Sequence, residues 1–271
     1  MSLLMILGLV VIGLLLIAGL LALRFQFTLA AVGQQVLAAT ANRPVAVGDL
    51  PDAVRRVADH AGARIGEGRA VRLTQSAQMQ WTPGGNWTPM DARQDIGLNA
   101  PGFAWVATRR FGPLPVMTIL DAFAQGRGLL KVRLLGAVPV ANAEGADLDL
   151  GEAMRYLAEL PWAPDAILNN PLIGWRVAPD GWLEARLPVA DRQALVRLRL
   201  NPAGDIVEIT AKDRPARMPD GSIILRDWRG VFADHAQMGG RRIPLTGEVG
   251  YGLGETYQPY WRGRILSYDL V

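Results

Sequence analysis

The first 23 residues constrain this chain more than any other part of it. Leu3–Leu23 is a run of 21 residues without a charged side chain. As a helix rising ~1.5 Å per residue, the run would span ~31 Å, which matches the ~30 Å hydrocarbon core of a bilayer. We therefore expect residues 1–23 to be a transmembrane anchor, with contact to a membrane through residues 3–23.

An uncleaved anchor is favoured over a signal peptide. A signal peptide has a basic segment before an apolar core of only ~7–15 residues. Here no Lys or Arg precedes Leu3, and the apolar run is longer than such a core. Cleavage near Ala30 or Ala31 stays open as the alternative. The chain has no Cys, which excludes disulfides and a lipoprotein anchor.

Charges near the span give a weak indication of its orientation. Arg24 and Arg43 follow the span and nothing basic precedes it, which favours a cytoplasmic domain. That rule weakens when a long domain is translocated. The charges alone therefore leave the side of the membrane undecided.

The remaining composition excludes several classes of function. Basic and acidic residues nearly balance, at 28 and 25, and they are interspersed, so we expect no nucleic-acid partner. Only two histidines are present, His60 and His235, far apart in sequence and without any Cys, so we expect no metal site. No nucleophile-elbow or phosphate-loop motif occurs. We expect no cofactor.

Two further regions follow the anchor. Residues 24–68 are expected to be a juxtamembrane linker with helical potential at 25–40, followed by a helix over 51–63. From Arg69, short runs that suit strands alternate with turn signals, and residues 69–271 are predicted to form about ten strands. One helix interrupts them near 149–159, with Asp149 as its N-cap and Glu152 close to a capping box. The predicted fold class is α+β and mainly β, a curved antiparallel sheet (half-open barrel) wrapped over one or two helices.

The interrupting helix and one strand carry the candidate site residues. Asp121 lies in a predicted strand, and Glu159 lies one helical turn after Arg155, beside Tyr156. Two carboxylates facing one cavity could act as acid and base, while structural ion pairing with Arg is the simpler interpretation. Eight tryptophans, several of them in predicted strands, suit the lining of an apolar cavity, while a packed core is the simpler interpretation. The ligand-binding candidates are Asp121, Arg155, Tyr156, Glu159, Trp162, Trp105, Trp175 and Trp228.

The segment Arg155-Tyr-Leu-Ala-Glu-Leu-Pro-Trp-Ala-Pro164 resembles a bacterial family of uncharacterised proteins with an Arg-Tyr-Leu-x-Glu-x-x-Trp-x-Pro signature. The segments 102–105, 121–128, 228–235 and 240–244 fit the same family, so the resemblance covers roughly residues 69–270. The layout is also similar to the lipoprotein-localisation (LolA/LolB-like) half-barrel. That second resemblance implies an extracytoplasmic carrier of hydrophobic molecules, against the indication of Arg24 and Arg43.

Three functions remain open at this point. The leading hypothesis is a membrane-anchored, extracytoplasmic, non-catalytic binding protein for a hydrophobic or lipid-like small molecule. The second is a hydrolase-type enzyme using Asp121 and Glu159. The third is a structural envelope-assembly module, whose protein partners the sequence does not identify.

Overall fold

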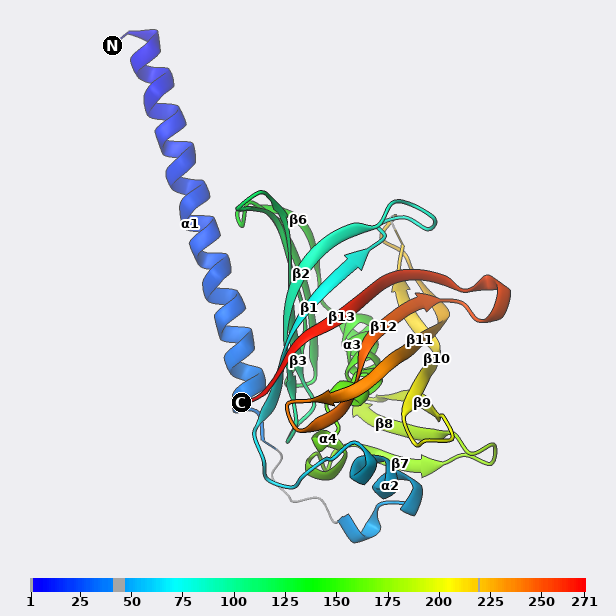
Figure 1. Ribbon diagram of the computed structural model, residues 1–271. Helices are drawn as coiled ribbons and strands as arrows, with labels where there is room; N and C mark the ends of the chain where they lie inside the picture. Colours follow the sequence, from blue (N-terminus) through cyan, green and yellow to red (C-terminus); the bar gives the residue numbers. More distant parts are fainter. Residues whose placement is uncertain (1, 41–46, 219) are drawn as a thin grey trace.

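The computed structural model describes residues 2–40, 47–218 and 220–271. Arg43, used above for the orientation, lies outside the described residues. The predicted fold class is confirmed, because the described chain forms one curved antiparallel sheet with a few helices and an N-terminal apolar helix (Figure 1). The sheet has 13 strands, where the sequence predicted about ten.

The elements follow one another in two runs of strands separated by helices. The first part comprises α1 (Leu3–Ala38), η1 (Val47–Asp49), α2 (Asp52–His60), β1 (Ala70–Met79), β2 (Thr88–Gly97), β3 (Phe103–Phe111), β4 (Leu114–Ala124), β5 (Arg127–Leu134) and β6 (Val138–Ala143). The connecting helices are α3 (Ala146–Ala158), η2 (Leu160–Trp162) and α4 (Asp165–Asn169). The second part comprises β7 (Gly174–Val177), β8 (Leu183–Val189), β9 (Arg192–Leu200), β10 (Ile206–Arg217), β11 (Ile223–Met238), β12 (Arg241–Tyr251), η3 (Gly254–Thr256) and β13 (Gln258–Leu270).

The strand order explains why the helices lie inside the sheet. The order is β6-β5-β4-β3-β2-β1-β13-β12-β11-β10-β9-β8-β7, so two meanders meet where β1 pairs with β13. The two edge strands, β6 and β7, are consecutive in the sequence. The connection between them must cross from one edge to the other, and α3, η2 and α4 make this crossing through the concave side (Figure 1).

Helix α3 buries the apolar stripe that its sequence predicts. Leu150, Met154 and Leu157 all lie in the core. The predicted cap is wrong, because the helix begins at Ala146 after Gly145, and no side chain caps it. Asp149 instead accepts a hydrogen bond from the backbone N–H of Gly128 on β5 at 2.7 Å, so a tertiary contact takes the place of the local cap.

Two glycines make room for tryptophan rings in the concave face. Gly247 on β12 and Gly263 on β13 are direct cross-strand partners. A Cβ on Gly247 would lie 2.9 Å from the Trp162 ring, and one on Gly263 would lie 2.7 Å from the Trp261 ring. Trp162 also donates a hydrogen bond to the carbonyl of Pro244 at 2.8 Å. The absence of side chains at this pair therefore lets the indoles pack against the sheet.

Helix α1 continues well beyond the uncharged run. Its C-terminal part buries Phe25, Val32 and Val36 against the outer face of the sheet. That outer face is formed by Ala104 on β3 and by Leu120 and Ala122 on β4. Residues 24–38 of the expected juxtamembrane segment are therefore helix, docked on the domain. By length and composition, α1 could cross a membrane as an anchor or serve as a signal sequence.

Candidate functional site

A cavity of about 80 Å³ lies between the C-terminal end of α3 and the concave face of the sheet. Its walls are aromatic or aliphatic over most of their extent, and its charged residues come from β4, β10, α3 and the residue that follows α3. The lining residues are Met79, Trp105, Asp121, Arg155, Ala158, Glu159, Trp162, Arg214, Trp228, Phe232, Val249, Tyr260 and Trp261.

Arg155 is the central cation of this cavity. Its Nε donates to Oε1 of Glu159 at 2.9 Å, and its Nη1 donates to Oδ2 of Asp121 at 2.5 Å. The guanidinium also stacks on Phe103 at 4.6 Å and on Trp105 at 5.2 Å from the ring centroids. The side chains of Arg155 and Asp121 keep 17% and 19% exposure, and both border the cavity. The Arg155–Glu159 pair, one helical turn apart, is mostly buried as well.

A chain of amide hydrogen bonds holds Glu159 in place. Nε2 of Gln94 donates to Oε2 of Glu159 at 2.5 Å, and Nε2 of Gln75 donates to Oε1 of Gln94 at 3.0 Å. The indole N–H of Trp105 then donates to Oε1 of Gln75 at 2.9 Å. Both carboxylate oxygens of Glu159 therefore accept hydrogen bonds from the protein, and the network fixes the rotamers around Arg155.

A second buried arginine borders the same cavity. Arg214 on β10 lies 3.4 Å from Glu152 of α3 and donates to the hydroxyl of Tyr251 at 2.7 Å. Its guanidinium stacks on Trp228 at 4.8 Å from the ring centroid. Two guanidiniums are thus enclosed by three carboxylates and several aromatic faces, which favour cations.

Burial governs the protonation of these groups. Desolvation, together with the charge of Asp121, raises the pKa of Glu152 to about 8, although Arg214 and Arg155 oppose the rise. Desolvation also raises the pKa of Asp121 and of Glu159, against the attraction of Arg155. Glu152 is therefore largely protonated near neutral pH, whereas burial and the charge of Arg155 act in opposite directions on Asp121 and Glu159.

Some polar atoms at the cavity remain without a hydrogen-bond partner among the described residues. Oδ1 of Asp121 is an acceptor of this kind, and Nε of Arg214 and Nε1 of Trp261 are donors. All three residues line the cavity. Because a buried polar group without a partner costs ~1–3 kcal/mol, an acceptor and two donors here suit water or a polar ligand group.

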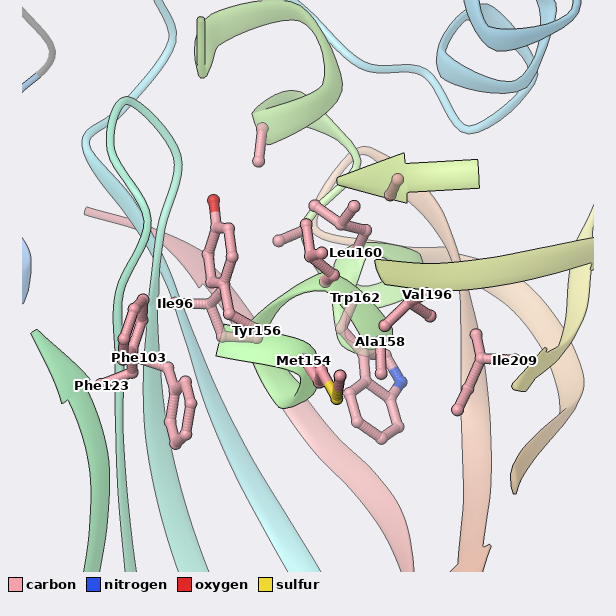
Figure 2. Packing of buried hydrophobic residues seen from close by; sticks show 14 of the residues in the cluster. Ile96, Phe103, Phe123, Met154, Tyr156, Ala158, Leu160, Trp162, Val196 and Ile209 are labelled. Atoms are coloured by element: carbon pink, nitrogen blue, oxygen red, sulfur yellow. The ribbon is translucent and has the colours of Figure 1, made fainter. Parts of the chain in front are cut away.

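The structure gathers six of the eight candidate residues around this cavity: Asp121, Arg155, Glu159, Trp162, Trp105 and Trp228. Tyr156 points away from it, as Figure 2 shows, and its hydroxyl donates to the carbonyl of Gly97 at 3.0 Å. Trp175 lies on the edge strand β7, outside the cavity lining. Whether these residues bind a ligand stays a prediction.

Sequence reasoning missed four members of the network: Gln75, Gln94, Glu152 and Arg214. The two glutamines could have been found, because each alternates with inward apolar neighbours on its strand. Arg214 gave no such signal, since the pairing register of β10 shifts between Ala211 and Arg214 and breaks the alternation.

A larger hollow of about 730 Å³ lies elsewhere, between the end of α1 and the turns near Ala100 and Gln125. Its lining contains no charged side chain. The chain runs from Thr40 at this hollow into residues outside the described part, so we base no site on it.

The described chain is thus a half-barrel with an apolar N-terminal helix and a cavity with a charged floor. It belongs to a family of unknown function, DUF6544, whose model matches residues 42–263. The family resemblance expected from the sequence is confirmed, and the match begins earlier than the expected residue 69. A search of the curated proteins finds none that matches this sequence.

Several solved structures share part of the shape. A LolA superfamily protein from Nitrosomonas europaea is 9% identical, with a TM-score of 0.43 over 80% of this chain and 93% of that chain. A DUF1329 family protein from Desulfovibrio piger is 8% identical, with a TM-score of 0.42 over 81% and 94%. A putative outer membrane lipoprotein-sorting protein domain from Vibrio parahaemolyticus is 8% identical, with a TM-score of 0.42 over 80% and 90%. At these scores, we draw no argument from the likeness.

Proposed function

We propose that this protein is a membrane-anchored, non-catalytic binding protein for a hydrophobic small molecule that carries one uncharged polar group. The observation that supports the proposal is the cavity itself. It combines tryptophan, phenylalanine and valine walls with polar groups, of which an acceptor and two donors lack partners among the described residues. Apolar walls with a few convergent polar groups are the usual composition of a small-molecule site.

The polar atoms of the floor limit the chemistry of the ligand. Oδ1 of Asp121 needs a donor, whereas Nε of Arg214 and Nε1 of Trp261 need acceptors. A hydroxyl or amide group can donate and accept at once. A charged group would have to lose its hydration to enter a buried cluster that already holds two arginines. We therefore favour an apolar alcohol or amide over a fatty acid or an amine.

The size of the cavity indicates how much of the ligand it holds. At about 80 Å³, it is smaller than the ~300 Å³ or more of a typical site for a whole drug-sized molecule. We propose that the polar group and the first carbons occupy it. The rest of the molecule would lie along the half-buried Met79 and Val249 at its border.

The hydrolase alternative receives less support. Both oxygens of Glu159 already accept hydrogen bonds, one from Arg155 and one from Gln94. Of Asp121 and Glu159, only Asp121 keeps an oxygen without a partner among the described residues. A two-carboxylate mechanism needs a free acid and a free base. The envelope-assembly alternative is the second candidate, because the small cavity leaves much of the interior filled with side chains.

The side of the membrane is a separate part of the proposal. We propose the extracytoplasmic side, which the resemblance of the predicted layout to the lipoprotein-localisation half-barrel implies, against the weak indication of Arg24. Protease accessibility of the domain in intact cells and in cells with a permeabilised outer membrane tests this placement. Protection in both, with digestion only after lysis of the inner membrane, would place the domain in the cytoplasm.

The binding proposal is tested on the full-length protein purified in mild detergent. Native mass spectrometry and solvent extraction should find one class of uncharged, hydroxyl- or amide-bearing apolar molecule at near-equal molar amount. Met79→Trp, which fills the border of the cavity, should lower that amount several-fold. Leu266→Trp, at an exposed position on β13, is the matched control and should not. Absence of any bound species, or equal amounts in both variants, would refute the proposal.

A further inference from the structure

The exposed apolar side chains of the domain gather at one end of the sheet. We define the upper rim as the turns that join β1 to β2, β3 to β4, β5 to β6, β10 to β11 and β12 to β13. Beyond α1, 16 large hydrophobic side chains are exposed in the described residues, and 11 of them lie within three residues of these turns. Soluble surfaces rarely concentrate apolar groups in this way unless the patch contacts something.

The turn between β5 and β6 lies against α1. A Cβ on Gly136, in the turn between β5 and β6, would lie 3.2 Å from the Cβ of Ala22. The guanidinium of Arg133 lies 5.5 Å from the ring centroid of Phe25. Ala22 is the next-to-last residue of the uncharged run Leu3–Leu23. The turn is therefore at the level where this run ends.

The direction of α1 shows where the turn between β5 and β6 points. The helix docks along the outer face of the sheet, with Val36 near the lower ends of β3 and β4, beside Gly102. From there α1 runs up past the upper rim toward its N-terminus, and the β5–β6 hairpin rises beside it (Figure 1). If the run up to Leu23 fills a bilayer, the turn at Gly136 meets the surface of that bilayer.

The side chains at these tips have the composition of a membrane-interface surface. Phe111 is 78% exposed and Leu135 is 64% exposed, and Leu114, Val138 and Val140 are exposed beside them. Basic groups flank the tips at Arg24, Arg109, Arg110 and Arg133, and Arg110 lies 3.7 Å from the carboxylate of Asp91. Apolar residues flanked by arginines favour insertion among lipid headgroups.

We propose that the tips of the β3–β4 and β5–β6 hairpins insert into the interfacial layer of the bilayer that α1 spans, so that the upper rim of the half-barrel rests on the membrane. The inference rests on the membrane-anchoring part of the proposed function. The bilayer is chosen over a protein partner because the exposed tips continue directly from the apolar surface of α1. Met79, which borders the cavity, lies at the same end of the sheet, so a ligand could pass from the bilayer to the cavity.

The absence of Cys allows a direct test on the full chain. Single-cysteine variants at Phe111, Leu135, Ile65 and Leu14 are labelled with an environment-sensitive fluorophore and reconstituted into lipid nanodiscs. Ile65 is 65% exposed, which matches Leu135, and lies near α4, away from the upper rim. Leu14→Cys reports on α1 itself. Thermal unfolding of each variant confirms that the fold is kept.

Quenching by aqueous iodide and by spin-labelled lipid then gives the answer. We expect the labels at 111 and 135 to be quenched by lipid and shielded from iodide several-fold relative to the label at 65. If Leu14→Cys is lipid-embedded while labels at 111 and 135 match the label at 65, the tips do not insert and this inference is overturned. If the label at 14 is itself exposed to iodide, the anchor and the inference both fail.

Discussion

At the residue scale, the interior of this half-barrel is marked by buried charge. Arg155 and Arg214 are enclosed with Asp121, Glu152 and Glu159, and each arginine also stacks on aromatic rings. Burying an ion pair usually adds little stability compared with well-packed apolar residues. An arrangement that brings four of these ionisable groups to one small cavity is therefore easier to explain by ligand recognition than by folding.

The raised pKa of Glu152 predicts a pH dependence of stability. Burial raises the pKa of Glu152 in the folded state to about 8, above its ordinary value of 4.5, so the unfolded state loses its proton first as pH rises. This group therefore stabilises the fold fully below about pH 4.5, and its contribution falls between there and about pH 8. In Glu152→Gln this fall should be absent. The free energy of unfolding of the variant, relative to that of the wild type, should therefore rise by on the order of a few kcal/mol between about pH 4.5 and 8.

Urea unfolding at several pH values measures this difference. Glu144→Gln, at an exposed position, is the control and should track the wild type at every pH. The prediction concerns the difference in the free energy of unfolding between variant and wild type. Other carboxylates have lowered pKa values, so their contribution to stability is lost as the pH falls, in both proteins alike. The pKa of Asp205, for example, is lowered by its hydrogen bond with Arg242. A difference that stays constant from pH 4.5 to 8 would contradict the prediction.

At the element scale, close packing of α3 and η2 on the sheet depends on small residues at set positions. Gly247 on β12 accommodates the ring of Trp162, whereas a Cβ added at Gly151 in α3 would lie 3.7 Å from Arg214, an ordinary contact. The same substitution should therefore have opposite effects at the two sites. Both changes add one methyl group, so the difference comes from the surroundings of the two positions in the fold.

Gly247→Ala should destabilise the domain by about 1–3 kcal/mol, because a Cβ there would lie 2.9 Å from an indole that is itself fixed by a hydrogen bond. Gly151→Ala should be neutral or stabilising by up to ~1 kcal/mol, since Ala favours helix over Gly. Thermal and chemical unfolding of both variants gives the comparison. Equal effects would show that the sheet yields around Trp162.

At this scale, sequence patterns identified helices and strands better than they identified the hydrogen-bond and ion-pair partners of single side chains. The stripe Leu150, Met154 and Leu157 predicted the buried face of α3, and the alternation in 196–200 predicted a strand. The true partner of Asp149 could not be predicted. Its carboxylate accepts a hydrogen bond from the backbone N–H of Gly128, which is 21 residues away in the sequence. In the same way, the sequence alone does not place Asp121 beside Glu159, and only the fold shows that both bind Arg155.

At the scale of the whole molecule, the order of the strands differs from the order of synthesis. The last strand, β13, lies in the centre of the sheet between β1 and β12, whereas β6 and β7, near the middle of the chain, form its edges. The N-terminal and C-terminal meanders are joined by the pairing of β1 with β13, which runs from Val71–Leu270 to Met79–Trp261. The two halves can therefore form one sheet only when the final residues are in place.

This topology predicts a gradient of local stability across the sheet. Amides of β1 and β13 have strand neighbours on both sides and a core beneath, so they should exchange hydrogen only through global unfolding. Amides of β6, where Val138 and Val140 are exposed, should exchange earlier by fraying of the edge. Hydrogen exchange followed by peptide mass spectrometry on the full-length protein resolves the strands. If β6 were protected as strongly as β13 in nanodiscs but not in detergent, the membrane would hold this edge, in agreement with the proposed insertion of the β5–β6 tip. If β6 were protected as strongly as β13 in both nanodiscs and detergent, the predicted gradient of stability would be contradicted.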